Sequence, residues 1–329
     1  MLRDMMPQFE LYQPDTLENA LNLAKELDDK AWIMAGGYDS LDWFKDRAKR
    51  PSAVIDIGGI ASLKGIKETA DGLEIGALTT LTEIATNALV REKYSLLASA
   101  AGRVASPQIR NAGTLGGNLS QDTRCWYYRS GVNCYRAGGN SCFADSPQGQ
   151  NREHCLYGAN RCVAVSPSDT GTAAVALDAR MVVRSSAGEK VIPAEEFFIG
   201  PAIDITHMTV LKKGEILTAV RFPKEWAGAK FYFEKVTDRN TWDFALVSVA
   251  AAMLIDGGVI KKIRVACGAV ECVPRRLKAV EEAVTGSPQN ADTALLAGKT
   301  AVQGATPLNF NHFKIPLMEN LVRRAIRDA

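Results

Sequence analysis

The sequence has little histidine, no long apolar run and no excess of charge of one sign. Its three histidines, His154, His207 and His312, argue against a histidine-rich metal site. No stretch approaches the roughly 18 consecutive apolar residues of a membrane-spanning helix. Lys and Arg number 39 against 37 Asp and Glu, for a net charge of +2, and no basic run supports nucleic-acid binding. Residues 1–7 lack a basic stretch followed by an apolar one, so we expect no Sec-type export signal.

Cysteine, by contrast, is concentrated in one place. Five of the seven cysteines lie from Cys125 to Cys162, and the stretch from Arg129 to Asn160 shows no helical or strand periodicity. Such a long loop is normally functional or disordered. Its cysteines are too widely spaced for a zinc ribbon, and disulfides would need an oxidising compartment. An iron–sulfur cluster held by four thiolates would supply the core that the loop lacks; several free thiols or a structural zinc ion are the alternatives.

The remaining segments predict helices and strands around this loop. Helices are expected over 14–27 (capped by Asp15 or Thr16), from the capping box Thr80/Glu83 through Leu89, and over 96–104, 277–285, 292–301 and 317–327. Strands are expected over 31–34, 53–57, 73–77, 181–183, 216–220, 230–236, 246–255 and 259–270. The turn at 256–258 is typical of a hairpin, and residues 223–228 are interpreted as a linker. Three adjacent strands followed by helices indicate a small α+β domain at the end of the chain.

Three short segments have the composition of a binding site. Ala35-Gly36-Gly37-Tyr38-Asp39-Ser40-Leu41 follows a strand, and its successive N–H groups can form a phosphate-binding nest. Asn111 to Leu119 again combines small residues with polar ones, and two such segments suggest a long ligand with a diphosphate. In Ser166-Pro167-Ser168-Asp169, Asp169 could accept hydrogen bonds from ribityl or ribose hydroxyls. Each segment also has a purely structural interpretation. The first two can be tight turns, and Asp169 can be the N-cap of a helix.

In this order, the three segments closely resemble the FAD-binding medium subunits of the xanthine dehydrogenase (molybdenum hydroxylase) family. Later segments agree, including Gly214-Glu215-Ile216-Leu217, Phe233-Glu234-Lys235-Val236 and Cys267-Gly268-Ala269-Val270. The resemblance implies an α+β fold. A two-part FAD-binding domain of the PCMH/VAO type is expected over residues 1–225, with an iron–sulfur loop inserted at about 123–163. A C-terminal domain with a three-stranded antiparallel sheet and three helices would follow over residues 226–329.

The resemblance also implies the cofactor contacts. The backbone of Ala35, Gly36, Gly37, Tyr38, Asp39 and Ser40 should hold the FAD diphosphate, and Thr114, Gly117 and Asn118 should line the same cofactor. Asp169, Leu217 and Lys235 match family positions near the ribityl, adenine and isoalloxazine portions. The family commonly has a small or polar residue where this chain has Tyr38, and a stacking role for Tyr38 on the flavin is a hypothesis.

A subset of the family carries an insertion after the second FAD segment that holds a [4Fe–4S] cluster, as in periplasmic aldehyde oxidoreductases and 4-hydroxybenzoyl-CoA reductase. By resemblance to the aldehyde-oxidoreductase type, its ligands here are Cys125, Cys134, Cys142 and Cys162. Cys155 has no matching position. Cys267 and Cys272 are interpreted as buried or incidental thiols.

The implied function is electron transfer within a heterotrimer. A large molybdenum-cofactor subunit would act on an aldehyde or aromatic substrate, and a small subunit with two [2Fe–2S] clusters would pass electrons to this FAD and then to an external carrier. No side chain of this chain is expected to act as a catalytic acid, base or nucleophile. The alternatives are the medium subunit of a 4-hydroxybenzoyl-CoA reductase and a free-standing flavin or thiol redox protein. We expect a cytoplasmic protein, or a periplasmic one if a partner carries the export signal.

Overall fold

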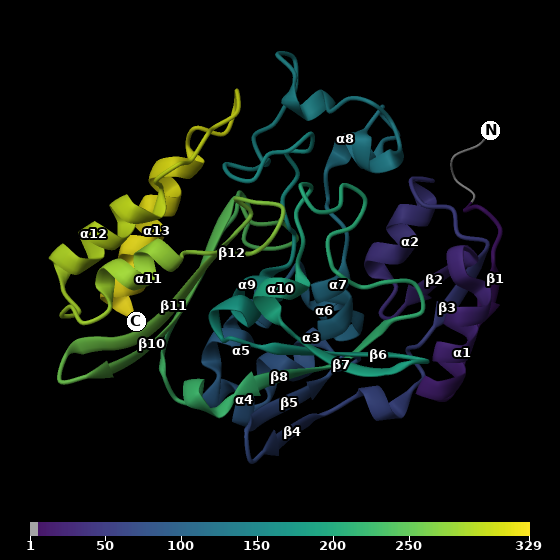
Figure 1. Cartoon of the computed structure of the whole chain (residues 1–329), viewed down its shortest axis with the longest axis horizontal. Coiled ribbons are helices and arrows are strands. Elements are labelled where there is room, and N and C mark those ends of the chain that lie inside the picture. Colours follow the sequence, from purple (N-terminus) through teal and green to yellow (C-terminus); the bar gives the residue numbers. More distant parts are fainter. Residues whose placement is uncertain (1–5) are drawn as a thin grey trace.

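The computed structural model describes residues 6–329, and residues 1–5, on which part of the export-signal expectation rests, lie outside them. Its elements form three sheets with helices packed between and around them (Figure 1). No helix in the described part of the chain is long and apolar enough to cross a membrane.

A small subdomain at the N-terminus holds a three-stranded parallel sheet in the order β1-β3-β2. Its elements are β1 (Glu10–Tyr12), α1 (Leu17–Leu27), a 3-10 turn (Asp28–Lys30), β2 (Ala31–Met34), α2 (Tyr38–Lys45), β3 (Ala53–Asp56) and a 3-10 turn (Ala61–Leu63). Of the two capping candidates for α1, Thr16 is the N-cap, and its hydroxyl accepts from the Asn19 N–H. The first glycine segment is therefore a strand-to-helix turn, and α2 was not expected from the sequence.

The second subdomain is built on an antiparallel sheet in the order β4-β5-β8-β6-β7. Its strands are β4 (Ile66–Thr69), β5 (Gly72–Gly76), β6 (Arg180–Ser185), β7 (Gly188–Pro193) and β8 (Ile216–Pro223). Its helices are α3 (Leu81–Thr86), α4 (Ala88–Lys93), α5 (Ser95–Gly102), α6 (Pro107–Ala112), α7 (Leu115–Ser120), α9 (Asp169–Ala176) and α10 (Ala194–Phe197). The capping box at Thr80 is present, but the helix ends at Thr86 because Asn87 is extended and caps α4.

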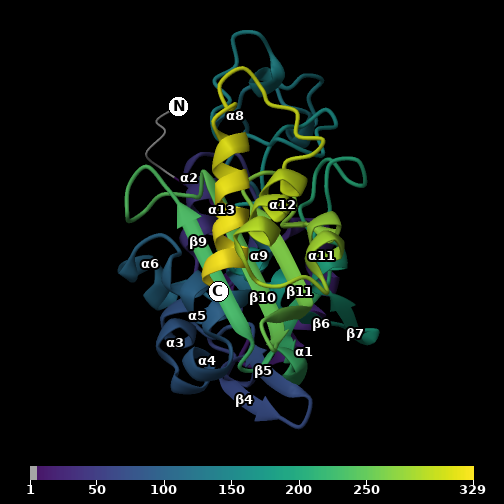
Figure 2. The same cartoon turned by 90° about the vertical axis from the view of Figure 1, so that its left-hand side faces the viewer.

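The C-terminal part is a four-stranded sheet with helices on both faces. Its elements are β9 (Lys230–Val236), β10 (Val247–Asp256), β11 (Val259–Gly268), β12 (Arg275–Arg276), α11 (Lys278–Val284), α12 (Ala291–Ala301) and α13 (Lys314–Asp328). The three expected strands and three helices are present, and the two-residue β12 is a fourth strand. Helices α11 and α13 cover one face (Figure 2), while α5 and α9 of the second subdomain contact the other. The expected linker is packed, because a 3-10 turn (Lys224–Trp226) buries Trp226 completely. The domain boundaries 1–225 and 226–329 stay a prediction.

The segment from residue 123 to 163, here called the cysteine loop, lies between the C-terminal helices and α2 (Figure 1). It contains only α8 (Trp126–Arg129) and two 3-10 turns (Tyr135–Ala137 and Phe143–Asp145). Its own apolar cluster has three buried members, Ala144, Cys155 and Val163. The loop therefore depends on its neighbours for most of its order.

Candidate functional site

One large cleft brings the three binding segments together. It has a volume of about 960 Å³ and lies between the N-terminal and second subdomains. All twelve residues named from the sequence as cofactor contacts line it: Ala35, Gly36, Gly37, Tyr38, Asp39, Ser40, Thr114, Gly117, Asn118, Asp169, Leu217 and Lys235. A cleft of this size is at the upper end of the roughly 300–1,000 Å³ that ligand pockets span, so it has room for a dinucleotide.

The first segment presents a helix start without a side-chain cap. Gly37 is the N-cap of α2 with φ of 81°, and no described side chain caps the helix there. The N–H groups of the first turn of a helix have no partner within the helix, so at this end they can bind an anion. Gly36 lets the second segment approach, because a Cβ on Gly36 would lie 2.1 Å from the Ala112 carbonyl oxygen. This arrangement fits the diphosphate of FAD.

The second and third segments are joined through Asn118. Its Oδ1 accepts hydrogen bonds from the hydroxyls of Ser168 at 2.8 Å and Thr170 at 2.5 Å. Thr114 begins α7, and its Oγ1 accepts from the Gly117 N–H at 3.1 Å. The side chain of Asn118 is thus committed to holding the wall of the cleft together.

Asp169 and Lys235 form a buried ion pair at the inner end of the cleft. Lys235 Nζ donates to Asp169 Oδ2 at 2.6 Å and to the Arg103 carbonyl oxygen at 3.1 Å. Burial raises the pKa of Asp169. The N-cap interpretation of Asp169 is wrong, because the cap of α9 is Ser168, whose Oγ accepts from the Gly171 N–H.

Exposed aromatic rings stand at the mouth of the cleft. Tyr38 is half-exposed there, so its stacking on the flavin stays a prediction. Trp242 and Phe244 also line the cleft and are exposed. Trp242, with φ of 74°, was missed from the sequence, since it lies in a loop without periodicity.

The other four cysteines of the loop all interact electrostatically with Cys162. Cys162 interacts electrostatically with Cys125, Cys134 and Cys142, and Cys134 and Cys142 face each other across a β-bridge. The Cys155 sulfur also interacts with Cys162. The assignment of Cys155 as the cysteine that is not a ligand therefore stays a prediction.

The surroundings of these cysteines differ in their effect on the thiol. Burial raises the pKa of Cys125 to about 12, and its Sγ lies 3.4 Å from His154 Nε2. The neighbouring Cys272 thiol and the charge of Arg136 lower the pKa of Cys162. Cys272 is buried, as expected, but it is not incidental, because it contacts a proposed ligand. Its role could not be found from the sequence, since Cys272 lies on the C-terminal domain.

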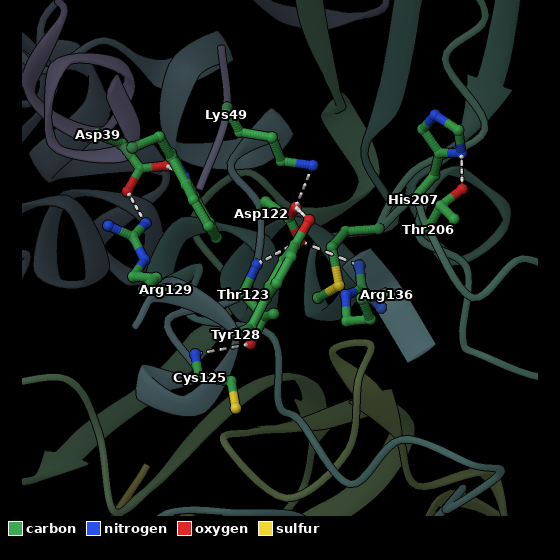
Figure 3. Close-up of polar contacts among 12 residues, drawn as sticks. Asp39, Lys49, Asp122, Thr123, Cys125, Tyr128, Arg129, Arg136, Thr206 and His207 are labelled. Carbon is green, nitrogen blue, oxygen red and sulfur yellow. Dashed lines mark hydrogen bonds and ion pairs between the residues drawn. The ribbon is translucent and has the colours of Figure 1, made fainter. Parts of the chain in front are cut away.

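Arg136 places a buried positive charge beside the same cysteines. Its Nη2 donates to Asp122 Oδ1 at 3.0 Å, and Lys49 and Tyr128 also contact the Asp122 carboxylate (Figure 3). Within residues 6–329, no group of three or more His, Cys, Asp or Glu side chains is arranged to hold a single metal ion. Four sulfurs around one zinc ion at about 2.3 Å would form such a group, so the geometry does not favour a structural zinc site.

Comparisons with known proteins agree with this geometry. Residues 7–225 match the family model of the FAD binding domain in molybdopterin dehydrogenase, and residues 232–329 match that of the CO dehydrogenase flavoprotein C-terminal domain. The chain is 34% identical over 303 residues to the aldehyde oxidoreductase FAD-binding subunit PaoB of Escherichia coli, covering 91% of each chain. It is 29% identical over 286 residues to the glyceraldehyde dehydrogenase medium chain of Sulfolobus acidocaldarius, covering 87% of this chain and 84% of that one.

A solved structure of carbon monoxide dehydrogenase from Hydrogenophaga pseudoflava has the same fold. Its TM-score is 0.79 at 27% sequence identity, with 99% of this chain and 98% of that chain covered. The fold expected from the sequence is thereby confirmed. The chain belongs to the FAD-binding medium subunits of the molybdenum hydroxylase family and is an oxidoreductase subunit.

Proposed function

We propose that this chain is the electron-transfer subunit of a heterotrimeric molybdenum enzyme that oxidises aldehydes, and that it holds a [4Fe–4S] cluster beside its FAD. The observation that carries the proposal is that Cys134 and Cys142 face each other across a β-bridge and that both, like Cys125, interact electrostatically with Cys162. A loop whose own apolar cluster has only three buried members gains a core when four of its thiolates share one cluster.

The charges around the cysteines favour a cluster with thiolate ligands. Four thiolates give such a centre a net negative charge, and burying that charge is costly unless a cation lies nearby. Arg136 supplies this cation, and it interacts electrostatically with Cys162. The Cys272 thiol lies beside the same sulfur, and polar neighbours of a ligand tune the potential of an iron–sulfur centre.

The side chains of this chain have a binding role in the proposed reaction. Bound FAD supplies the exchange between one-electron carriers, such as iron–sulfur clusters, and two-electron carriers. The start of α2 would bind the diphosphate, and Asp169 and Lys235 would face the remainder of the cofactor from the inner end of the cleft.

The substrate and partners are proposed from the relatives. Aldehyde oxidation is favoured because PaoB is named as part of an aldehyde oxidoreductase. A large molybdenum-cofactor subunit would bind the aldehyde, a small subunit would carry two [2Fe–2S] clusters, and an external carrier would take the electrons. We propose that the assembly lies in the cytoplasm, which cell fractionation would test.

Cysteine substitution tests the cluster and its ligands. Cys134→Ser should abolish the iron–sulfur absorbance and lower iron and sulfide in the purified assembly, whereas Cys155→Ser should keep both at the wild-type level. Equal loss of iron in the two variants would overturn the ligand assignment, and wild-type protein without iron would overturn the cluster.

The same purified assembly tests the partners. Molybdenum, flavin and the subunit composition should be measured together with iron and sulfide. A chain that purifies alone, with flavin but no molybdenum subunit, would support the free-standing flavoprotein. Reduction of an aromatic CoA thioester, rather than oxidation of aldehydes, would support the reductase alternative.

A further inference from the structure

Two arginines of the cysteine loop hold two aspartates of α2. Arg129 Nη2 donates to Asp39 Oδ1 at 2.7 Å, and its Nη1 donates to Asp42 Oδ2 at 2.8 Å. Arg124 Nη1 donates to Asp39 Oδ1 at 2.8 Å, and its Nη2 lies 3.0 Å from Asp42 Oδ2. Each carboxylate therefore meets both guanidinium groups, and Figure 3 shows the contact between Arg129 and Asp39.

This contact is partly desolvated and tightly oriented. The side chain of Arg129 is 7% exposed, and its guanidinium carbon lies 3.8 Å from the ring centre of Trp43. Trp43 is completely buried, and its Nε1 donates to Asp39 Oδ2 at 3.0 Å. Both oxygens of Asp39 thus have partners. Because Asp39 is itself 26% exposed, loss of Arg129 leaves it a partly solvated carboxylate that still pairs with Arg124.

The same helix faces the flavin cleft. Asp39 is the second residue of α2 and lines the cleft next to the uncapped helix start. A bare carboxylate there would repel a diphosphate that the helix N-terminus attracts. The two arginines neutralise Asp39 and Asp42 through their side chains, which leaves the backbone N–H groups of the first turn available to the diphosphate.

We propose that Arg124 and Arg129 are positioning residues for the flavin, which couple the folding of the cysteine loop to FAD binding. They fix α2 in place and cancel the negative charge beside the diphosphate. Because coupling between two sites is reciprocal, bound FAD in turn stabilises the cysteine loop. The inference rests on the flavin cleft and holds whether or not the loop carries a cluster.

FAD affinity measures this coupling. The protein, purified with its co-purifying subunits, is freed of flavin and titrated with FAD by flavin fluorescence. R129Q should weaken FAD binding by between about 5-fold and 150-fold, the usual range for coupled sites. R124Q should weaken it as well, and it provides the test if R129Q does not fold. R152Q is the matched control, since Arg152 is an exposed arginine of the same loop that pairs with Asp238.

A double variant separates charge cancellation from simple loosening of the structure. Removing the charge of Asp39 in R129Q/D39N should restore part of the affinity that R129Q loses, whereas a purely structural role predicts a further loss. Wild-type affinity in both R129Q and R124Q, or a weaker double variant, would overturn the inference. Iron content keeps the two proposals apart. If R129Q loses FAD affinity and the wild type contains no iron, the cluster is contradicted but the coupling is not. If R129Q keeps wild-type FAD affinity and the wild type contains iron, the coupling is contradicted but the cluster is not.

Discussion

Gly116 shows how tightly single residues set the shape of the flavin cleft. A Cβ at this position would lie 2.8 Å from the Ala77 Cβ and 3.0 Å from the Ala77 carbonyl oxygen. Both are atoms of the sheet end on which α7 rests, and the Gly116 N–H donates to that same carbonyl oxygen at 2.8 Å. A side chain at Gly116 must therefore displace α7, which carries Gly117 and Asn118 of the cleft wall.

Gly116→Val should consequently weaken FAD binding by between about 5-fold and 150-fold, since overpacking of this kind costs about 1–3 kcal/mol. The measurement is the flavin content of the purified protein and its FAD dissociation constant. Gly59→Val is the matched control, because a Cβ on Gly59 has no atom within 4 Å. Unchanged flavin content in Gly116→Val would contradict the role of the second segment.

The residues of the cleft were predictable from the sequence, but their partners were not. The three segments are contiguous motifs, and each lies at the start of a helix. The arginines of the cysteine loop lie 85 and 90 residues from Asp39, and no periodicity links positions so far apart. The contact between Cys162 and Cys272 was hidden for the same reason.

Among the elements, α13 joins the C-terminal domain to the cysteine loop. Lys314 at its first turn is completely buried, and its Nζ donates to three carbonyl oxygens, those of Glu153, His154 and Ala269. Asn311, just before the helix, donates to the carbonyl oxygens of His154 and Cys155. These contacts give the segment around Cys155 a structural role that needs no metal.

Lys314→Met should destabilise the protein by about 1–3 kcal/mol or more, because it removes the N–H donor of buried carbonyl groups. Urea unfolding measures the free energy of unfolding, and faster trypsin cleavage within residues 129–152 would report loosening of the cysteine loop. Lys299→Met is the control, since Lys299 is exposed on α12. Equal stability of the two variants would show that the three hydrogen bonds contribute nothing.

The same lysine predicts a pH dependence. Burial lowers the pKa of Lys314 to about 7, below the value of about 10.4 in an unfolded chain. Between these values the unfolded state binds the extra proton, so the stability of the wild type relative to Lys314→Met should rise with pH from about 7 to about 10. If the difference in unfolding free energy between the wild type and Lys314→Met, measured with urea, does not change across this range, the lowered pKa of Lys314 is contradicted.

Element types were easier to predict than element ends. The strands β9, β10 and β11 follow from apolar runs, and the alanines of β10 are buried because helices cover both faces of the sheet. The split between α3 and α4 depends on the extended backbone of Asn87, and α2 depends on the turn at Gly37. Neither changes the hydrophobic pattern enough to be recognised.

At the scale of the whole molecule, the ion pair between Asp169 and Lys235 crosses from the FAD-binding part to the C-terminal part. Asp169 begins α9, which packs on β10 and β11, and Lys235 lies on β9 of the same sheet. Both side chains are more than nine-tenths buried. Because α9 packs in one apolar cluster with Ala250 and Ala266 of the C-terminal sheet, the pair connects the wall of the cleft to that sheet.

Lys235→Met should destabilise the protein by about 3–5 kcal/mol, since it leaves Asp169 buried without its cation. The double variant Lys235→Met/Asp169→Asn should recover part of this loss. In the single variant the folded-state pKa of Asp169 lies above its unfolded value of about 3.9, so the folded state binds the extra proton and stability falls as pH rises above about 4. Urea unfolding at pH 5 and pH 8 measures both effects. A single variant that is equally stable at the two pH values, or a double variant no more stable than the single one, would show that the charge of Asp169 does not need Lys235.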